Sequence, residues 1–235
     1  MRRILISGAN GGIGNAIAEQ AFEDGHKLSL GIRNFEKFKG TGLEAKSKSS
    51  NRVFSFKYDA LDPNSASIWV KNTMKVFGGI DTIIHCAGIL HKTELLFSDG
   101  EMHQLDELWK TNLMGPWLLT RAAWEHISNE RNGRIIVLVS MSGKRSKTNL
   151  AGYSASKFAL RSLCQSIRNE GWENGTRVTA ISPGWVNTEM AKEVRAIPKE
   201  EMTQPHDIAL ICSNILKMEN SCVPFEIDIN CILEN

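Results

Sequence analysis

Tyr153 and Lys157 are the residues of this 235-residue chain whose types and spacing point most directly to chemistry. They stand four positions apart, so on a helix their side chains share one face, about a turn apart. A phenol has a pKa of about 10, which makes it a weak proton donor at neutral pH. A nearby ammonium and a helix amino terminus both favour the phenolate, and we expect them to lower the pKa of Tyr153. Such a pair could give a proton to an oxygen atom that gains negative charge during a reaction.

A glycine-rich segment near the start of the chain predicts a second kind of chemistry, the binding of phosphate groups. It reads Gly-Ala-Asn-Gly-Gly-Ile-Gly from Gly8 to Gly14 and follows the apolar run Arg3–Ser7. Glycines permit the tight turn and close backbone approach that a pyrophosphate needs, and a following helix offers free N–H groups. The alternative is a structural turn, since glycine-rich turns are common. The position between a predicted strand and the predicted helix Gly12–Asp24 favours dinucleotide binding.

The elements that must position these groups alternate between short apolar runs and longer stretches of helical periodicity. The predicted strands are Arg3–Ser7, Lys27–Ile32, Val53–Tyr58, Thr82–Cys86, Ile135–Ser140, Val178–Ser182 and Phe225–Asn230. The predicted helices are Gly12–Asp24, Asn34–Lys46, Asn64–Phe77, His103–Ile127, Ser154–Gly171 and Pro205–Lys217. The strands show little alternation of polar and apolar residues, as expected when helices cover both faces of a sheet. We therefore predict a single doubly wound α/β domain over residues 1–235, a Rossmann-type fold with a seven-stranded parallel sheet. Ligands of such sheets bind beyond the carboxyl ends of the strands.

Composition and charge exclude several other classes of protein. A net charge of +2 gives no general attraction to nucleic acid or to a membrane surface. No run of about 18 apolar residues occurs, so no membrane span is expected. The five cysteines are an odd number without a C-x-x-C pair, and neither a disulfide framework nor a metal site is predicted. We expect a reduced, cytoplasmic protein.

The glycine spacing G-x-x-x-G-x-G, with the Tyr-x-x-x-Lys motif that follows it, resembles the short-chain dehydrogenase/reductase family. The resemblance extends over nearly the whole chain, from Ile4 to about Asp228, and rests on several independent motifs in the right order. It implies a catalytic tetrad of Asn112, Ser140, Tyr153 and Lys157.

In this family the serine donates a hydrogen bond to the substrate oxygen and the tyrosine donates the proton. The lysine binds the nicotinamide ribose, and the asparagine anchors a water relay to the lysine. Ser142 is a rival for the serine role, but the segment Ser-Met-Ser-Gly aligns best with Ser140 as the catalytic member. A Tyr-x-x-x-Lys pair alone arises by chance in many helices, whereas the complete set in this order does not.

The resemblance also implies a set of cofactor contacts spread along the chain. Besides Tyr153 and Lys157, these are Gly8, Asn10, Gly11, Gly12, Ile13, Gly14, Arg33, Asp59, Ala60, Ala87, Gly88, Pro183, Gly184, Val186 and Thr188. The chain departs from the family at His85 and Cys86, where two asparagines are usual before Ala-Gly. A lone histidine at a strand end is more often a packed, hydrogen-bonded residue than a catalyst, and we assign His85 no catalytic role.

Arg33 indicates which dinucleotide is preferred. Enzymes that select NAD place a carboxylate at the end of the second strand to bind the ribose hydroxyls. Here that position is Ile32, and no acidic residue occurs before Glu36. The guanidinium of Arg33 could bind a 2′-phosphate in a bidentate manner, although Arg33 could also be a surface residue. We expect NADP(H) to be preferred over NAD(H).

The substrate side is less well defined by the sequence. We expect the pocket to be bounded by Leu90, His91, Met141, Ser142, Asn149, Trp185 and the segment 189–203, a short lid. Trp185 could stack against the substrate or pack under the lid. After Asp228 the chain departs from the family's usual Asp-Gly-Gly, and family tetramers often pack through this end. The long helices His103–Ile127 and Ser154–Gly171 keep apolar faces, so a homodimer is expected, with a tetramer as the alternative.

Together these features predict an NADP(H)-dependent oxidoreductase that reduces a ketone, an aldehyde or a 3-oxoacyl thioester. One alternative is the reverse reaction, the oxidation of an alcohol with NAD(P). Another is a protein that binds NADP(H) as a sensor without catalysis, although such a protein would be expected to have lost Tyr153 or Lys157. The substrate is expected to be a small molecule, with no role for nucleic acid or a membrane.

Overall fold

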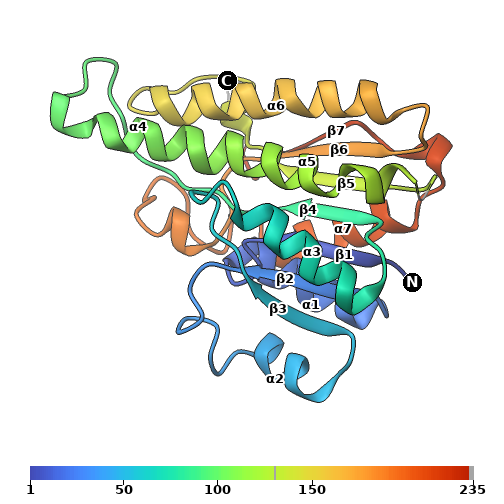
Figure 1. The fold of residues 1–235 in the computed structure, drawn as a ribbon. Coiled ribbons are helices and arrows are strands. Elements are labelled where there is room, and N and C mark those ends of the chain that lie inside the picture. The colour runs from blue at the N-terminus through green and yellow to red at the C-terminus, as the bar shows by residue number, and fades with distance from the viewer. Residues whose placement is uncertain (130, 233–235) are drawn as a thin grey trace.

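Seven parallel strands form one sheet in the computed structural model, which describes residues 1–129 and 131–232 (Figure 1). The spatial order is β3-β2-β1-β4-β5-β6-β7. The strands are β1 (Arg3–Ser7), β2 (Lys27–Ile32), β3 (Val53–Lys57), β4 (Thr82–His85), β5 (Arg134–Leu138), β6 (Arg177–Pro183) and β7 (Glu226–Ile229). Each predicted strand agrees with the structure within two residues at either end. The predicted Rossmann-type α/β fold is confirmed.

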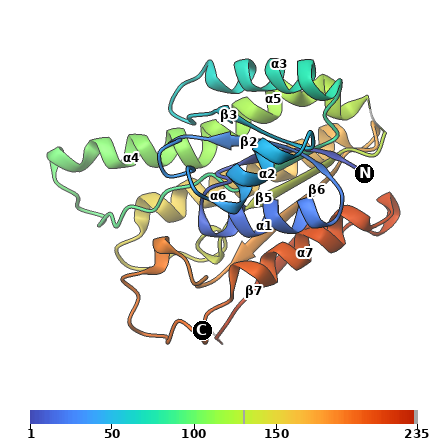
Figure 2. The same ribbon diagram turned by 90° about the horizontal axis from the view of Figure 1, so that it is seen from below.

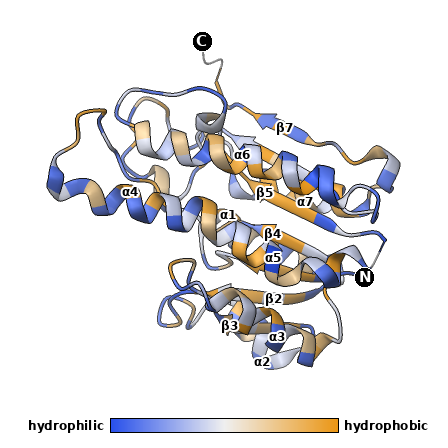
Figure 3. Ribbon diagram, turned by 45° about the horizontal axis from the view of Figure 1, so that its top comes forward, coloured by the Kyte–Doolittle hydropathy of each residue, from blue (hydrophilic) through white to orange (hydrophobic). Residues whose placement is uncertain are grey.

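Helices cover both faces of the sheet, as Figures 1 and 2 show. They are α1 (Gly12–Glu23), α2 (Gly42–Ser49), α3 (Ser65–Phe77), α4 (Met102–Trp109), α5 (Gly115–Ser128), α6 (Ala151–Gly171) and α7 (Pro205–Lys217). Helices α1 and α7 pack on one face, and α3, α5 and α6 pack on the other. Successive side chains of a strand point to the two cores in alternation, since Ile4 and Ile6 belong to one apolar cluster and Leu5 to the other. Figure 3 shows the central strands in hydrophobic colours, in agreement with strands buried on both sides.

Two predicted helices differ from the structure. The segment predicted as Asn34–Lys46 begins as a loop, because the Asn34 side chain accepts hydrogen bonds from the backbone N–H groups of Glu36 and Lys37. The helix starts only after Thr41, whose hydroxyl accepts from Glu44 N at 3.2 Å, and it continues to Ser49.

The predicted helix His103–Ile127 is interrupted. A π-helical turn, Lys110–Met114, separates α4 from α5. Pro116 follows in the first turn of α5 and has no N–H to donate to the preceding turn, so the regular α-helical bonding pattern cannot pass through it. Asn112 lies within this π-helical turn.

No helix in the described part of the chain is long and apolar enough to cross a membrane. All five cysteines are free thiols. Within residues 1–129 and 131–232, no three histidine, cysteine or acidic side chains gather as metal ligands would.

Candidate active site

The glycine segment lies at the carboxyl edge of the sheet, between β1 and α1. Gly8 has a φ of +67°, and a Cβ there would lie 2.8 Å from the backbone nitrogen of Ala87. A Cβ at Gly12 would lie 2.6 Å from Cγ2 of Thr188. Only glycine fits at these two positions. Segments far apart in the sequence, those of Ala87 and Thr188, are therefore brought against the phosphate loop.

A cavity at one end of this edge contains the residues predicted for the adenosine half of a cofactor. Besides glycines of the loop, it is lined by Asn10, Arg33, Asp59, Ala60 and Ala87. The Asn10 amide approaches the carbonyl oxygen of Asn34 at 3.5 Å and so joins the loop to the segment that carries Arg33. A carboxylate oxygen of Asp59 accepts a hydrogen bond from Leu61 N. Arg33 is exposed at the rim, where it can reach a ligand in the cavity.

Lys57 was not predicted as a site residue, yet it lies beside Arg33. It is the last residue of β3, which pairs with β2 through Ile32 and Lys57. Its ammonium donates to the carbonyl oxygen of Arg33 at 2.5 Å. Two cations therefore occupy the end of β2. The sequence showed a lysine at the end of a predicted strand. Its place beside Arg33 could be inferred only from the pairing of β3 with β2, which the sequence does not give.

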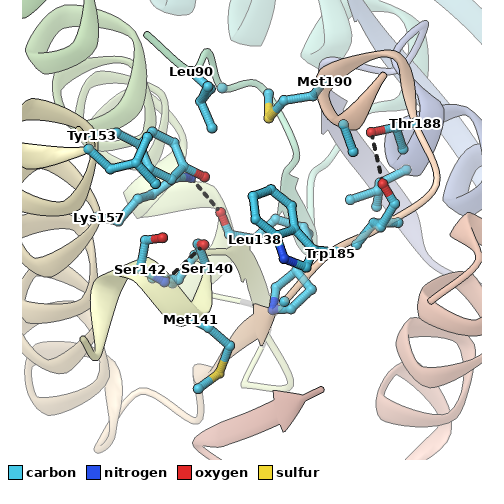
Figure 4. Close-up of a pocket in the computed structure, with 18 of the residues that line it drawn as sticks. Leu90, Leu138, Ser140, Met141, Ser142, Tyr153, Lys157, Trp185, Thr188 and Met190 are labelled. Carbon is cyan, nitrogen blue, oxygen red and sulfur yellow. Dashed lines mark hydrogen bonds between the residues drawn. The ribbon is translucent and has the colours of Figure 1, made fainter. Parts of the chain in front are cut away.

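A second cavity, of about 130 Å³, contains three members of the predicted tetrad, Ser140, Tyr153 and Lys157 (Figure 4). Its walls also include the predicted residues Ile13, Gly88, Leu90, Met141, Ser142, Pro183, Gly184, Trp185, Val186 and Thr188. His91 and Asn149 were expected at this wall but do not line the cavity. The imidazole of His91 instead bonds the Glu107 carboxylate at 3.0 Å, and Asn149 is exposed.

The Tyr153 side chain is buried, with 6% of the residue exposed. It stands in the first turn of α6, as predicted from its spacing to Lys157. Burial raises the pKa of Tyr153, and a hydrogen bond with the Ser140 side chain opposes the rise. The expected lowering of its pKa was therefore wrong for the protein without ligands, because burial disfavours the phenolate more than nearby groups favour it. The phenol is protonated at neutral pH.

Lys157 is buried beside Tyr153. Its ammonium donates to the carbonyl oxygen of Leu138, at the end of β5, over 3.0 Å. The distance from its nitrogen to the Tyr153 ring centroid is 5.8 Å. Burial lowers the pKa of Lys157 to about 8. The ammonium thus lies near the phenol without a direct bond to it.

Ser140 lies two residues after the end of β5 and starts a short turn. Its hydroxyl accepts from the backbone N–H of Ser142 at 3.1 Å, which fixes the hydroxyl at the cavity wall. The turn Met141–Gly143 leads to Lys144, which forms ion pairs with Glu226 and Asp228 of β7. The segment that carries Ser140 is therefore fixed on one side by β5 and on the other by the ion pairs of Lys144.

Asn112 is fully buried and tied to the loop after β4. Its side-chain oxygen accepts from Ile89 N at 2.9 Å, and its nitrogen donates to Ile89 O at 3.0 Å. It also donates to the Ser156 hydroxyl at 3.1 Å. A Cβ added at Gly88 would lie 3.4 Å from Asn112 Oδ1 and 3.6 Å from Lys157 Nζ. Asn112 and Lys157 therefore flank the same glycine.

His85 and Cys86, the departures from the family pattern, serve different purposes. His85 is buried and its Nε2 bonds the Thr120 hydroxyl at 2.9 Å. Burial lowers the pKa of His85 to about 3, so the imidazole is neutral. Cys86 lines both cavities, and burial raises the pKa of its thiol. Neither side chain is suited to proton transfer at neutral pH.

The segment expected to act as a lid has a small apolar core of its own. Ala191, Ile197 and Met202 are buried together, and Trp185 packs against them. Trp185 also lines the cavity. Its position is therefore compatible with both roles considered for this tryptophan, stacking against a substrate and packing under the lid segment. Lys92, in the loop after β4, pairs with Glu193 at 3.2 Å.

Residues 2–199 match the family model described as short chain dehydrogenase, and the chain belongs to this family of oxidoreductases. An agropine synthesis reductase from Rhizobium rhizogenes is 31% identical over 232 residues, which are 99% of this chain and 53% of that protein. The chain thus spans about half the length of the first curated relatives it matches. An uncharacterized oxidoreductase from Staphylococcus aureus is 29% identical over 87% of this chain and 86% of its own.

Among solved structures, an alcohol dehydrogenase from Thermococcus sibiricus complexed with 5-hydroxy-NADP is 25% identical, with a TM-score of 0.87. The alignment covers 99% of this chain and 98% of that one. A short-chain dehydrogenase/reductase from Brucella melitensis is 28% identical, with a TM-score of 0.86 and coverage of 99% and 97%.

Proposed function

We propose that this protein is an NADP(H)-dependent carbonyl reductase in which Tyr153 is the proton donor. The observation that carries the proposal is one cavity that holds the Tyr153 phenol, the Lys157 ammonium and the Ser140 hydroxyl. This set can bind a carbonyl oxygen and protonate it. The relative from Rhizobium rhizogenes is named as a reductase, which supports the same class of reaction.

The shape of the site fits an extended dinucleotide. The adenosine cavity and the catalytic cavity share Cys86, Gly88 and Ile89, so they adjoin at this segment. Residues of the phosphate loop line both cavities, and the amino terminus of α1 offers N–H groups to an anion. Arg33 would hold the adenosine end, and Lys157 the nicotinamide ribose.

A nicotinamide held by Lys157 would supply a hydride to the carbonyl carbon. As the carbonyl oxygen gains charge, the Ser140 hydroxyl donates a hydrogen bond to it and Tyr153 transfers its phenolic proton to it. Lys157 then stabilises the phenolate, because opposite charges attract strongly in a buried site. Asn112 keeps the Ile89 backbone and the π-helical turn in place. The alternative of a sensor without catalysis is less well supported, because such a protein would have no use for a buried Tyr-Lys pair. For the alternative of alcohol oxidation, the ratio of oxidised to reduced cofactor decides the direction of the reaction.

The preference for NADPH is expected to depend on Arg33, with a smaller contribution from Lys57. Arg33→Ala removes a charge-assisted contact with the 2′-phosphate, and we expect NADPH to bind about 10- to 100-fold more weakly. Lys57→Ala should have an effect in the same direction of about three- to tenfold. NADH lacks this phosphate and should lose little. Fluorescence titration of both cofactors measures the four dissociation constants.

Lys48→Ala is the matched control, since this exposed lysine of α2 pairs with Glu44 on its own helix. Equal losses for NADPH and NADH in the Arg33 variant would remove Arg33 from the phosphate site.

We also infer a homodimer, formed through α5 and α6. A groove between these helices includes Trp117 and Trp124, and Trp117 and Phe158 are 50% and 40% exposed. An apolar surface of this kind is suited to association. Sedimentation should show a dimer at micromolar concentration, and a monomer would overturn the inference.

We further infer that the chain acts as a single catalytic domain with 189–203 as its lid. Its free thiols favour a reducing compartment, which indicates the cytoplasm.

A further inference from the structure

We propose that Glu226 is a positioning residue, which fixes the turn that carries Ser140 against α6, the helix of the proton donor. This inference rests on the proposed function and adds a residue that acts on the reaction through Ser140. Glu226 belongs to β7 and does not line the catalytic cavity. Its carboxylate forms ion pairs with Lys144, which ends the turn, and with Arg161 of α6. One side chain of β7 therefore joins the two segments that must meet in the active site.

Both oxygens of the Glu226 carboxylate accept hydrogen bonds. Arg161 donates to one oxygen from Nε at 2.6 Å and to the other from a terminal nitrogen at 3.2 Å. Lys144 donates to that second oxygen at 2.9 Å, and its ammonium also lies 2.7 Å from an oxygen of Asp228. The bond from Arg161 lowers the pKa of Glu226, burial opposes this, and the bond from Lys144 adds to the lowering. The side chains of Glu226 and Lys144 are 23% and 20% exposed, so their attraction is screened less than that of a fully exposed pair.

The alternation of β7 places Glu226 on this side of the sheet. Ile227 and Ile229 pack against the core beneath α1 and α7, so Glu226 and Asp228 point to the opposite face, which α6 covers. Figure 1 shows β6 and β7 next to α6. A carboxylate of this strand can therefore reach the catalytic helix, although β7 itself contributes nothing to the cavity wall.

The turn after Ser140 is short enough for its far end to determine where the hydroxyl lies. Three residues separate Ser140 from Lys144, and the backbone N–H of Gly143 donates to the carbonyl oxygen of Ser140 at 2.9 Å. A Cβ added at Gly143 would lie 2.9 Å from the carbonyl oxygen of Lys157, so the turn packs directly on the backbone of α6. The ion pairs of Glu226 fix the turn against the same helix one helical turn further along.

The position of the Ser140 hydroxyl matters because a hydrogen bond to developing charge depends on its geometry. Loss of such a donor costs about 10²- to 10³-fold in rate, and a misplacement of about 1 Å can cost up to about 10²-fold. Without the Glu226 carboxylate the hydroxyl is still present, but the turn loses its link to Arg161. We therefore expect a loss of about tenfold, smaller than the loss caused by removal of the hydroxyl.

A simpler role for Glu226 is structural. β7 ends the sheet, and charged side chains on such a strand hinder its pairing with other chains. A role of this kind is independent of Ser140. A positioning role instead requires that the effect of Glu226 disappears when the Ser140 hydroxyl is absent, because there is then no donor left to position.

The test is a double-mutant cycle of Glu226→Gln with Ser140→Ala. The single-turnover rate of NADPH oxidation is measured with protein in excess of NADPH, well below the Tm of each variant. The carbonyl is the fastest substrate from a panel of ketones, aldehydes and oxo acids, at saturating concentration. Glu226→Gln should lower this rate about tenfold when Ser140 is present and less than about twofold in the Ser140→Ala background. The affinity for NADPH should stay within about twofold throughout.

Two substitutions at Lys144 and a control elsewhere complete the set. Lys144→Met should reproduce the loss, and Lys144→Arg should keep the rate within about threefold of wild type because it keeps the charge. If Glu226→Gln does not fold, Lys144→Met takes its place in the cycle. Asp24→Asn is the matched control, since this carboxylate lies on the other face of the sheet, bonded to Ser213 and paired with Lys217 at 3.1 Å. It should change the rate less than about twofold.

A wild-type rate in Glu226→Gln would overturn the proposal, as would a loss of the same size with and without the Ser140 hydroxyl. In both cases the reductase assignment survives, because turnover is still observed. If the wild-type protein oxidises NADPH with no carbonyl of the panel, the proposed function itself fails.

Discussion

Tyr153→Phe is expected to lower kcat for carbonyl reduction about 10³-fold while the affinity for NADPH stays within about twofold. The substitution removes one hydroxyl from a buried ring and leaves the packing of α6 intact. General acid catalysis contributes about 10²- to 10⁴-fold, and the phenol is the group that we expect to protonate the carbonyl oxygen. Steady-state kinetics with NADPH, together with a fluorescence titration of NADPH, separate the two effects.

The other tyrosine of the chain supplies the control. Tyr58 is also buried, and its hydroxyl donates to the carbonyl oxygen of Gly115 at 3.3 Å. Tyr58→Phe should lower the free energy of unfolding by about 1 kcal/mol and leave kcat within about twofold. Full turnover in Tyr153→Phe would eliminate Tyr153 as the acid, whatever the result for Tyr58.

Lys157→Met is expected to abolish most activity and yet to stabilise the protein in the absence of cofactor. Loss of the ammonium removes the group that stabilises the phenolate, and we expect kcat to fall about 10²- to 10³-fold. The same ammonium is buried, and its pKa is lowered from 10.5 to about 8. Burial of this charge costs about 3 kcal/mol at neutral pH, offset in part by the bond to Leu138. The variant should therefore gain about 1 to 3 kcal/mol in the free energy of unfolding, which raises Tm by several degrees.

The dependence of this stabilisation on pH follows from the lowering of the Lys157 pKa in the folded protein. Below pH 8 the Lys157 side chain is protonated in both the folded and the unfolded chain, so the cost of the buried charge is fully present. Between pH 8 and 10.5 the unfolded chain binds more protons than the folded one, and the stability of the wild type rises with pH. The difference in Tm between Lys157→Met and wild type, measured by calorimetry, should narrow over this range. A difference that is constant from pH 7 to 10 would contradict the cost assigned to the buried ammonium.

Much of the fold could be predicted because local patterns determined it. The apolar runs of β1, β2 and β4 allow few alternatives to buried strands. Gly8 and Gly14 stand where neighbouring backbone approaches closely, and Gly12 stands where the Thr188 side chain does. The joining of distant segments followed from a general rule, that the carboxyl ends of parallel strands meet at one edge. The rule indicated where a ligand would bind, whereas the grouping of Ser140 with Tyr153 and the place of Thr188 near the cofactor phosphates were implied by the resemblance to the short-chain dehydrogenase/reductase family.

What could not be predicted depends on tertiary surroundings. The pKa of Tyr153 is set by burial, and no local pattern measures burial at a single phenol. The loop after Asn34 arises from two hydrogen bonds of one side chain, which outweigh the helical periodicity of the segment. Lys57 carries no motif, and its position beside Arg33 becomes apparent only when β3 lies beside β2.

The most direct test of the central claim follows hydride and proton transfer together. Purified protein is mixed with deuterated NADPH and a panel of ketones, aldehydes and oxo acids, and the alcohol products are identified by mass spectrometry. We expect one deuterium in each molecule of alcohol, one NADPH oxidised per alcohol formed, and loss of both signals in Tyr153→Phe. Tight binding of NADPH without formation of any alcohol across the panel would contradict the account and would indicate a cofactor-binding protein without reductase activity.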